Sequence, residues 1–264
     1  LRHNKLYLLT ATLTPKGKNQ YVEIDDYKRI AENRKVGLLN IKNPSENNTD
    51  TKFKINEKYE GNIRYPFKKI YNNAIEKTIS LARRDVFRNN NNSEGERNDI
   101  LLFVDTKRHV YDACKKITRK IGKNVLCVPY HRNQNNSQNK IINIIQKNNN
   151  EKISRIHDDF KGEKSDGEKK FYRSIIVVST AIAEASITLP QLTYVVDTGY
   201  NMSTIYNLEL GAQEIRNKLI TKNSSYQRRG RVGRVKEGTI YYMYMSNPQE
   251  KGVLSPMDYE IQNN

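Results

Sequence analysis

The sequence has little of the material from which disulfide scaffolds and metal sites are built. Its two cysteines, Cys114 and Cys127, both lie within apolar stretches. Two isolated cysteines make neither a disulfide framework nor a zinc site. The four histidines are scattered without the spacing of metal ligands. We therefore predict that both cysteines are small core residues in a reducing compartment, and that the chain holds no metal site of its own.

Long apolar runs are also missing. Each apolar run is far shorter than the roughly 20 residues that a membrane helix needs, which predicts a chain without a membrane segment. The sequence starts LRHNKLYLLT, with neither an initiator Met nor a signal-peptide pattern. We expect it to be a piece of a longer polypeptide.

Acidic residues are scarce beside basic ones. Lys and Arg total 46 against 29 Asp and Glu, which gives a net charge of +17. A balance this basic calls for a polyanion, and clustered Lys and Arg neutralise nucleic-acid phosphates well. An AT-rich genome, which raises Lys and Asn codons together, is a second explanation, and the Asn runs at 89–92 and 148–150 support it. Charge alone leaves both explanations open.

Two nucleotide-site motifs are absent as well. The sequence contains no GxxxxGK[ST] phosphate-binding loop and no Asp-Glu-x-His box. Phosphoryl transfer needs the Lys and the Mg²⁺-holding carboxylates that these motifs supply. By itself the chain is therefore not expected to hydrolyse a nucleotide.

What is present is a regular alternation of apolar strands and amphipathic helices. Strands are predicted at 99–104, 124–128, 174–180, 193–197 and 238–245, and helices at 67–86, 106–122 and 139–147. Apolar strands alternating with helices predict a parallel sheet covered on both faces. The span 97–246 has the size of one such domain. The polar stretch 148–173 is expected to be a loop insertion.

The most specific motif is QRRGRVGR at 227–234. We predict that Arg231 and Arg234, three residues apart, lie on one face of a helix, and that the glycines of the motif allow close approach to another surface. Two guanidiniums held in this way suit a phosphate that gains negative charge, which is the arginine-finger role in nucleotide hydrolysis. The alternative is a generic basic patch.

Four motifs in order resemble those of superfamily 2 helicases. QRRGRVGR resembles motif VI, most like the form in the flavivirus and pestivirus non-structural helicase. Residues 9–15 (LTATLTP) resemble motif III, residues 102–107 (LFVDTK) motif IV, and residues 178–190 (VSTAIAEASITLP) motif V. The resemblance implies a P-loop NTPase, or RecA-like, fold: a second motor domain that lacks the P-loop.

The resemblance also implies an organisation along the chain and a role for each motif residue. The first motor domain would end within 1–15, a linker or insertion with one helix would fill 16–96, the second motor domain would span 97–246, and a tail or third domain would start within 247–264. The implied sites are catalytic (Arg231, Arg234 and Gln227), nucleotide-binding (Glu184, Ser186 and Gly230), RNA-binding (Thr106, Lys107, Arg132 and Thr180) and coupling (Thr10, Ala11 and Thr12).

Two of these assignments have structural alternatives. A strand end followed by Ser-Thr and a helix start is a natural phosphate site, but Thr180 and Ser186 could equally cap a helix. Glu184 could be a solvated helix residue. Residues 201–222, after Asp197-Thr198-Gly199, resemble the long β-hairpin of the family, and the alternative is a helix at 212–219.

The functional expectation is the C-terminal motor domain of a viral, polyprotein-encoded, ATP-dependent RNA helicase. ATP and Mg²⁺ would bind mainly to the absent first motor domain. The expected partners are single-stranded RNA, that first motor domain and a third helicase domain. The expected location is the host cytoplasm, with viral replication membranes as a candidate place within it. The alternatives are a fragment of a cellular DEAH-type RNA helicase and a non-catalytic RNA-binding remnant.

Overall fold

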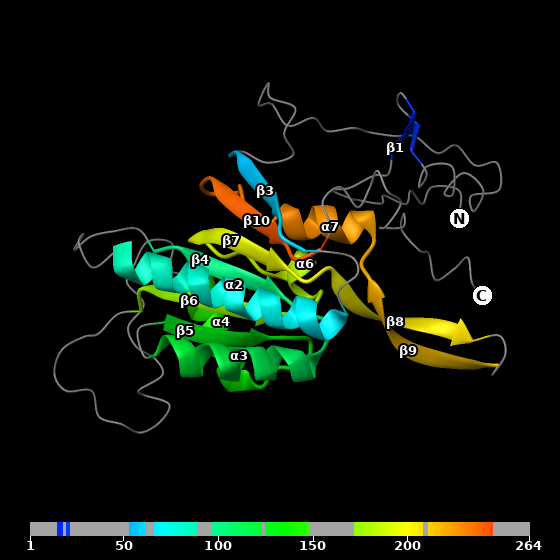
Figure 1. The fold of residues 1–264 in the computed structure, drawn as a ribbon, viewed down its shortest axis with the longest axis horizontal. Helices are drawn as coiled ribbons and strands as arrows, with labels where there is room; N and C mark the ends of the chain where they lie inside the picture. Colours follow the sequence, from blue (N-terminus) through cyan, green and yellow to red (C-terminus); the bar gives the residue numbers. More distant parts are fainter. Residues whose placement is uncertain are drawn as a thin grey trace, which may run out of the picture.

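The computed structural model describes residues 15–17, 20–21, 53–61, 66–88, 97–122, 125–147, 172–207 and 211–244. Within them, a six-stranded sheet forms the centre and helices cover it on both faces (Figure 1). The sheet strands are β3 (Ile55–Tyr59), β4 (Asp99–Phe103), β5 (Val125–Tyr130), β6 (Ser174–Ser179), β7 (Leu192–Asp197) and β10 (Gly238–Tyr242). The helices are α2 (Phe67–Arg88), α3 (Lys107–Ile121), α4 (Asn136–Lys147), α6 (Ala183–Ser186) and α7 (Lys222–Arg229).

The strand order is β3-β10-β7-β4-β6-β5, and every neighbouring pair is parallel. This confirms the predicted α/β architecture with a parallel sheet. Since all six strands point the same way, their carboxyl ends share one edge of the sheet. We call it the carboxyl edge.

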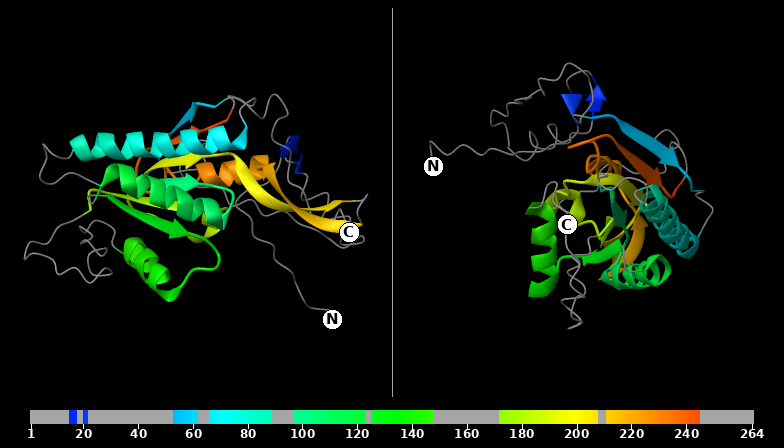
Figure 2. Two further views of the ribbon diagram at one scale, coloured as in Figure 1. Left: turned by 60° about the horizontal axis from the view of Figure 1, so that its bottom comes forward. Right: turned by 90° about the vertical axis from the view of Figure 1, so that its left-hand side faces the viewer.

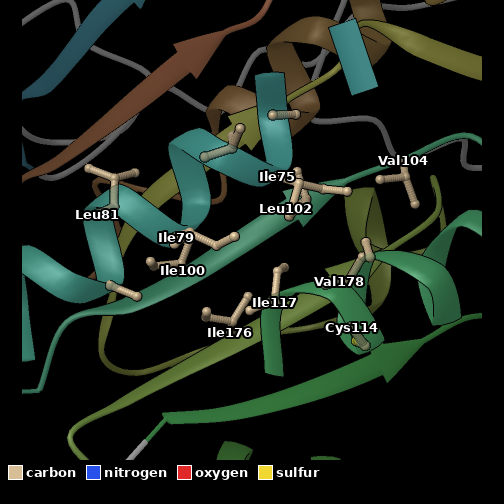
Figure 3. Packing of buried hydrophobic residues seen from close by; sticks show 14 of the residues in the cluster. Ile75, Ile79, Leu81, Ile100, Leu102, Val104, Cys114, Ile117, Ile176 and Val178 are labelled. Atoms are coloured by element: carbon tan, nitrogen blue, oxygen red, sulfur yellow. The ribbon is translucent and has the colours of Figure 1, made fainter. Parts of the chain in front are cut away.

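The apolar run of β4 explains why the sheet is covered on both faces. Side chains alternate between the faces of a strand. Ile100 and Leu102 therefore pack with α2 and α3, whereas Leu101 and Phe103 pack toward α4 and α6. All four are fully buried, and burying each stabilises the fold by about 1.5–3 kcal/mol. Figure 3 shows the first of these layers, in which side chains of α2 and α3 meet those of β4 and β6.

Helix α3 begins and ends where its sequence predicts. The Thr106 side chain accepts a hydrogen bond from the His109 backbone N–H at the first turn, and Gly122, with φ of +81°, follows the last. Val110, Ala113, Cys114 and Ile117 form its buried face. Cys114 faces Cys127 of β5 with 3.1 Å between the Sγ atoms, and both cysteines are free thiols.

The packed unit begins earlier than residue 97. β3 pairs with β10 at the edge of the sheet. Helix α2 packs on one face of the sheet and buries Ile70, Ala74, Ile75 and Ile79 there. Both elements come from 16–96, the segment predicted as a linker with one helix. The helix itself was predicted, but its packing on the sheet and the existence of β3 were not.

Two antiparallel pairs lie outside the main sheet. β8 (Tyr200–Asn207) and β9 (Ala212–Leu219) form a hairpin that extends beyond the sheet (Figure 2). The predicted hairpin is thus confirmed, and the alternative helix at 212–219 is wrong. β1 (Pro15–Gly17) and β2 (Gln20–Tyr21) form a second, short pair. None of the described helices combines the length and the apolar character needed to cross a membrane.

Several predicted segments lie outside the described residues. They are the end of the first motor domain with Thr10, Ala11 and Thr12, most of the insertion at 148–173, and the tail or third domain at 247–264.

Candidate functional site

The motif-like segments meet at the carboxyl edge. The Val104 N–H donates to the Ser179 carbonyl at 2.8 Å, and the Thr198 N–H donates to the Phe103 carbonyl at 3.4 Å. The ends of β4, β6 and β7 are therefore adjacent. Ligands of open parallel sheets bind at this edge. Thr106 and Thr180, which were predicted to bind RNA, follow the ends of β4 and β6 and therefore lie where a ligand could bind.

Thr106 carries out the capping role at the start of α3. Its Oγ1 accepts from the His109 N–H at 3.1 Å. Lys107, the first residue of the helix, is exposed, and so is Arg132, which follows β5. These two cations can reach a phosphate without breaking an interaction within the described part of the chain.

The loop after β6 uses its hydroxyls internally. Ser179 Oγ donates to the Thr180 carbonyl at 2.8 Å. Ser186 Oγ donates to the Ile182 carbonyl at 2.5 Å and lies 2.8 Å from the Tyr130 hydroxyl. Thr180 is half-buried, and its carbonyl accepts from the Ala183 N–H. Of these hydroxyls, that of Thr180 is the best placed for a ligand.

A buried ion network lies beneath the loop. The Arg228 guanidinium donates through Nε to Glu184 Oε1 and through Nη1 to Asp197 Oδ1, each at 2.7 Å. Ser224 Oγ donates to the same Glu184 oxygen at 2.5 Å, and the Tyr244 hydroxyl donates to Asp197 Oδ2 at 3.1 Å. Burial acts to lower the pKa of Arg228, but Asp197 and Glu184 together outweigh it and raise that pKa above its ordinary value.

This network gives Glu184 and Arg228 a clear local task. Glu184, predicted to bind nucleotide, ties α6 to α7 through Arg228. Arg228 was not predicted as a site residue, although it is the only arginine among the largest fully buried side chains of the described chain. Arg229, in contrast, reaches the Glu57 carboxylate of β3 at 2.8 Å.

Arg231 and Arg234 do not lie on a helix. Helix α7 ends at Arg229, and residues 230–236 form turns and bends. The prediction of one helical face was therefore wrong, because Gly230 ends the helix and Gly233 takes a φ of +74°. Such a conformation is open to glycine and strained for other residues. The loop nevertheless places both arginines after the same buried anchor, Arg228.

The two arginines are held by carbonyl oxygens. Arg231 Nε donates to the Gln227 carbonyl at 3.3 Å, and its Nη1 donates to the Ile187 carbonyl at 3.4 Å. Arg234 Nε donates to the Gly230 carbonyl at 2.8 Å. The carbonyls of Gln227 and Gly230, two other predicted site residues, thus each accept a hydrogen bond from one of the two guanidiniums.

The charges of this loop are poorly compensated. Burial, and then the charge of Arg234, lower the pKa of Arg231 to about 10, while Glu184 opposes the shift. Burial also lowers the pKa of Arg234. A lowered pKa means that the cationic form is disfavoured. The hydrogen bonds to carbonyl oxygens occupy only part of the N–H donors of each guanidinium, so the remaining donors can bind the oxygens of a phosphate.

A magnesium ion finds no comparable site. Among the described residues, no three His, Cys, Asp or Glu side chains gather as metal ligands do.

Comparison with known proteins decides the family. The family described as "Helicase conserved C-terminal domain" matches residues 82–236. The chain belongs to this family. The helicase C-terminal domain is that of a superfamily 2 helicase of the DExH/DEAH type, as the order of the motifs indicated.

Curated relatives of this helicase domain carry helicase names. A putative ATP-dependent RNA helicase, R366, of Acanthamoeba polyphaga mimivirus is 32% identical over 178 residues, 66% of this chain and 10% of the relative. The ATP-dependent RNA helicase DHX33 of Homo sapiens is 40% identical over 85 residues, 32% of this chain and 12% of the relative. The chain therefore spans about a tenth of the length of these relatives.

Solved structures support the RecA-like fold of the helicase domain. The DExH-box NTPase HrpB of E. coli superposes with a TM-score of 0.54 at 19% identity, over 80% of this chain and 21% of that one. A second structure of HrpB from Escherichia coli, titled a DEAH/RHA helicase, gives 0.55, again at 19% identity, over 80% of this chain and 22% of that one. At this identity the likeness concerns the fold alone.

Proposed function

We propose that this chain is the C-terminal motor domain of an ATP-dependent RNA helicase. In this role it supplies Arg231 and Arg234 to a nucleotide bound mainly by an N-terminal motor domain, and it forms half of the RNA track. The observation that carries the proposal is geometric: the loop that follows α7 begins at the buried Arg228 and brings Arg231 to the Ile187 carbonyl, in the segment that resembles motif V. The names of the relatives support ATP and RNA as the ligands.

Each part of the site has a task in this proposal. Arg231 and Arg234 stabilise negative charge that develops on the transferred phosphoryl group, which is worth a factor of about 10³ or more in turnover. Mg²⁺, held by the N-terminal motor domain, would neutralise charge on the phosphates. We call residues 230–236, which follow α7, the arginine loop. Arg228 fixes the start of this loop to α6 and to the end of β7. Thr180, Lys107 and Arg132 contact the RNA backbone.

The relatives favour the DEAH type over the flavivirus and pestivirus type. The human relative is DHX33, and the mimivirus relative R366 is likewise named an ATP-dependent RNA helicase. A DEAH-type helicase of cellular or giant-virus origin accommodates both. The host cytoplasm, with viral replication membranes as a place within it, stays a prediction that belongs to a viral origin.

The test uses the longer polypeptide that carries both motor domains. RNA-stimulated ATP hydrolysis is measured for Arg231→Ala and Arg234→Ala, with Arg229→Ala as a control of equal charge change. We expect the first two to lower turnover about 10³-fold while RNA affinity stays near that of the parent, and the control to keep most of its turnover. Near-normal turnover in the first two would reduce the loop to a basic patch.

The non-catalytic alternative predicts a different outcome. A remnant that only binds RNA would show no hydrolysis in the parent polypeptide, while RNA binding would persist. In both cases the +17 charge predicts RNA affinity that falls steeply as salt rises.

A further inference from the structure

A second candidate site lies on the other face of the sheet. A pocket of about 590 Å³ opens between the N-terminal ends of α2 and α3. Phe67 and Tyr71 of α2 line it together with Thr106 and His109 at the start of α3. Both helices pack on the face opposite to the one that holds Val232 of the arginine loop. The pocket is thus separate from the proposed nucleotide site.

Three rings form an aromatic cluster in this pocket. The centroids of Tyr71 and His109 are 4.6 Å apart, and those of Phe67 and His109 are 5.4 Å apart. The rings are fixed from behind: the Tyr71 hydroxyl donates to Asp112 Oδ2 at 2.8 Å, and His109 Nδ1 lies 2.5 Å from Asp105 Oδ1. A preordered aromatic surface can stack a planar ligand with little loss of side-chain entropy.

Positive charge surrounds the rings. Lys68 and Arg108 line the pocket, are exposed, and form no ion pair with a described residue. Lys116 Nζ lies 5.1 Å from the centroid of the Tyr71 ring and 2.7 Å from Asp112 Oδ2. Three cations therefore face one carboxylate. The complementary ligand is flat, aromatic and negatively charged.

The position of the pocket indicates where such a ligand would come from. Thr106 lies at the rim of the pocket, and Lys107 lies beside it. Both residues are at the carboxyl edge, where the RNA track is proposed. The Phe67 ring meets the Tyr200 ring edge-on at 5.0 Å, at the base of the β8–β9 hairpin. Asn217 of β9 donates to Asp105 at 3.0 Å. An RNA strand that crosses the carboxyl edge beside the hairpin would pass the mouth of the pocket.

We propose that this pocket receives one base of single-stranded RNA that has left the stack of its neighbours. The base stacks on the half-buried rings of Phe67 and His109, which the buried ring of Tyr71 supports from behind, while Lys68 and Arg108 bind the adjoining phosphates. Stacking of this kind tolerates any base, since each has a π face. The inference rests on the RNA-binding part of the proposed function, and it adds a base contact to a track otherwise made of backbone contacts.

The test measures binding of the full chain to a fluorescent oligouridine of single-stranded RNA. Phe67→Ala removes one ring from the rim of the pocket, and we expect about tenfold weaker binding. Arg108→Glu should weaken binding by a similar factor. Its control, Arg119→Glu, makes the same charge change at the other end of α3, where the residue is also exposed, and should cost less than threefold.

A second RNA separates stacking from charge. An oligomer of the same length with abasic sugars keeps every phosphate and has no ring to stack. We expect Phe67→Ala to bind it as the parent chain does, whereas Arg108→Glu still weakens binding. Thermal melts identify any variant that has lost its fold, and Arg108→Glu, at an exposed position, remains informative if Phe67→Ala unfolds.

The outcomes distinguish this inference from the proposed function. If the parent chain binds no RNA, both fail. If it binds RNA, and Phe67→Ala and Arg108→Glu behave like Arg119→Glu, the pocket inference alone is overturned. The pocket inference is likewise overturned if an acidic aromatic peptide occupies the pocket without displacing the RNA.

Discussion

The Arg228 guanidinium and the Asp197 carboxylate meet at 2.7 Å, and neither side chain is exposed to solvent. The pair joins α7, which carries the arginine loop, to the end of β7. Glu184 adds a second carboxylate to the same guanidinium at 2.7 Å. Substitution of Arg228 would leave the carboxylates of Asp197 and Glu184 without the positive charge that pairs with them.

We expect Arg228→Met to lower the free energy of unfolding by about 3–5 kcal/mol, because breaking a buried pair leaves an uncompensated buried charge. Urea unfolding followed by circular dichroism measures the loss. The matched control is Arg229→Met, whose partner Glu57 is 35% exposed. An exposed pair contributes about 1 kcal/mol or less. Equal losses in the two variants would contradict the assigned role of Arg228.

The arginine loop depends on a glycine. A Cβ at Gly233 would lie 2.7 Å from Ile55 Cγ1, and the residue has a φ of +74°. We expect Gly233→Ala to destabilise the fold by roughly 1–2 kcal/mol from the backbone alone, and by more from the contact with β3. At Gly230 the nearest atom would lie at 3.3 Å and φ is −67°, so Gly230→Ala should change the melting temperature little. The prediction fails if the two variants melt alike.

The cap of α3 can be separated from any contact of Thr106 with RNA. Thr106→Ala removes the acceptor for the His109 N–H and should cost about 1 kcal/mol. Thr106→Ser keeps the hydroxyl and should restore most of that stability. RNA titrations on both variants then report the second role: weaker binding by the alanine variant alone would be consistent with it. A serine variant as unstable as the alanine variant would show that the hydroxyl is not the stabilising group.

Stability should also respond to pH through His131. This side chain is buried, and its Nε2 lies 2.9 Å from the Tyr111 hydroxyl. Burial, and then the charge of Lys107, lower the pKa of His131 from 6.5. Below pH 6.5 His131 therefore takes up a proton in the unfolded chain but not yet in the folded chain. The free energy of unfolding should decrease as the pH is lowered from about neutral, and it should level off once the folded form is protonated too.

The measurement compares melting temperatures of the parent chain and His131→Gln between pH 5 and pH 8. We expect the parent to lose more stability than the variant on acidification, since glutamine cannot be charged. Other groups titrate in both proteins, and only the difference between them reports on His131. Parallel curves would contradict the lowered pKa.

Sequence reasoning succeeded where apolar periodicity and local signals agree. The apolar run at β4, the apolar face of α3 and the glycine at 122 identify strand and helix without any long-range contact. The cap that Thr106 provides was not predicted. It failed at β3, whose residues are half-buried or exposed, because an edge strand has no apolar run. The pairing of β3 with β10 joins residues far apart in the chain.

The arginines show a second kind of limit. Nothing in the letters of QRRGRVGR separates Arg228 from Arg234, since the difference lies in the two carboxylates, Asp197 and Glu184, that the fold brings to Arg228. The error about the helix was avoidable. A glycine after two basic residues is a helix C-terminal signal, and it places Arg231 outside α7.

The pairing of β3 with β10 has a consequence for anyone who shortens this protein. The family match spans 82–236, yet Gly238–Tyr242 forms the strand next to β7, and Ile55–Tyr59 covers its far side. A fragment cut to the match would lose both strands and most of α2, leaving β7 as an open edge. A fragment cut to 97–246 would keep β10 but lose β3, so the outer edge of β10 would be unpaired. Unpaired strand edges recruit other chains, so such fragments should aggregate, and expression is better begun ahead of Phe53.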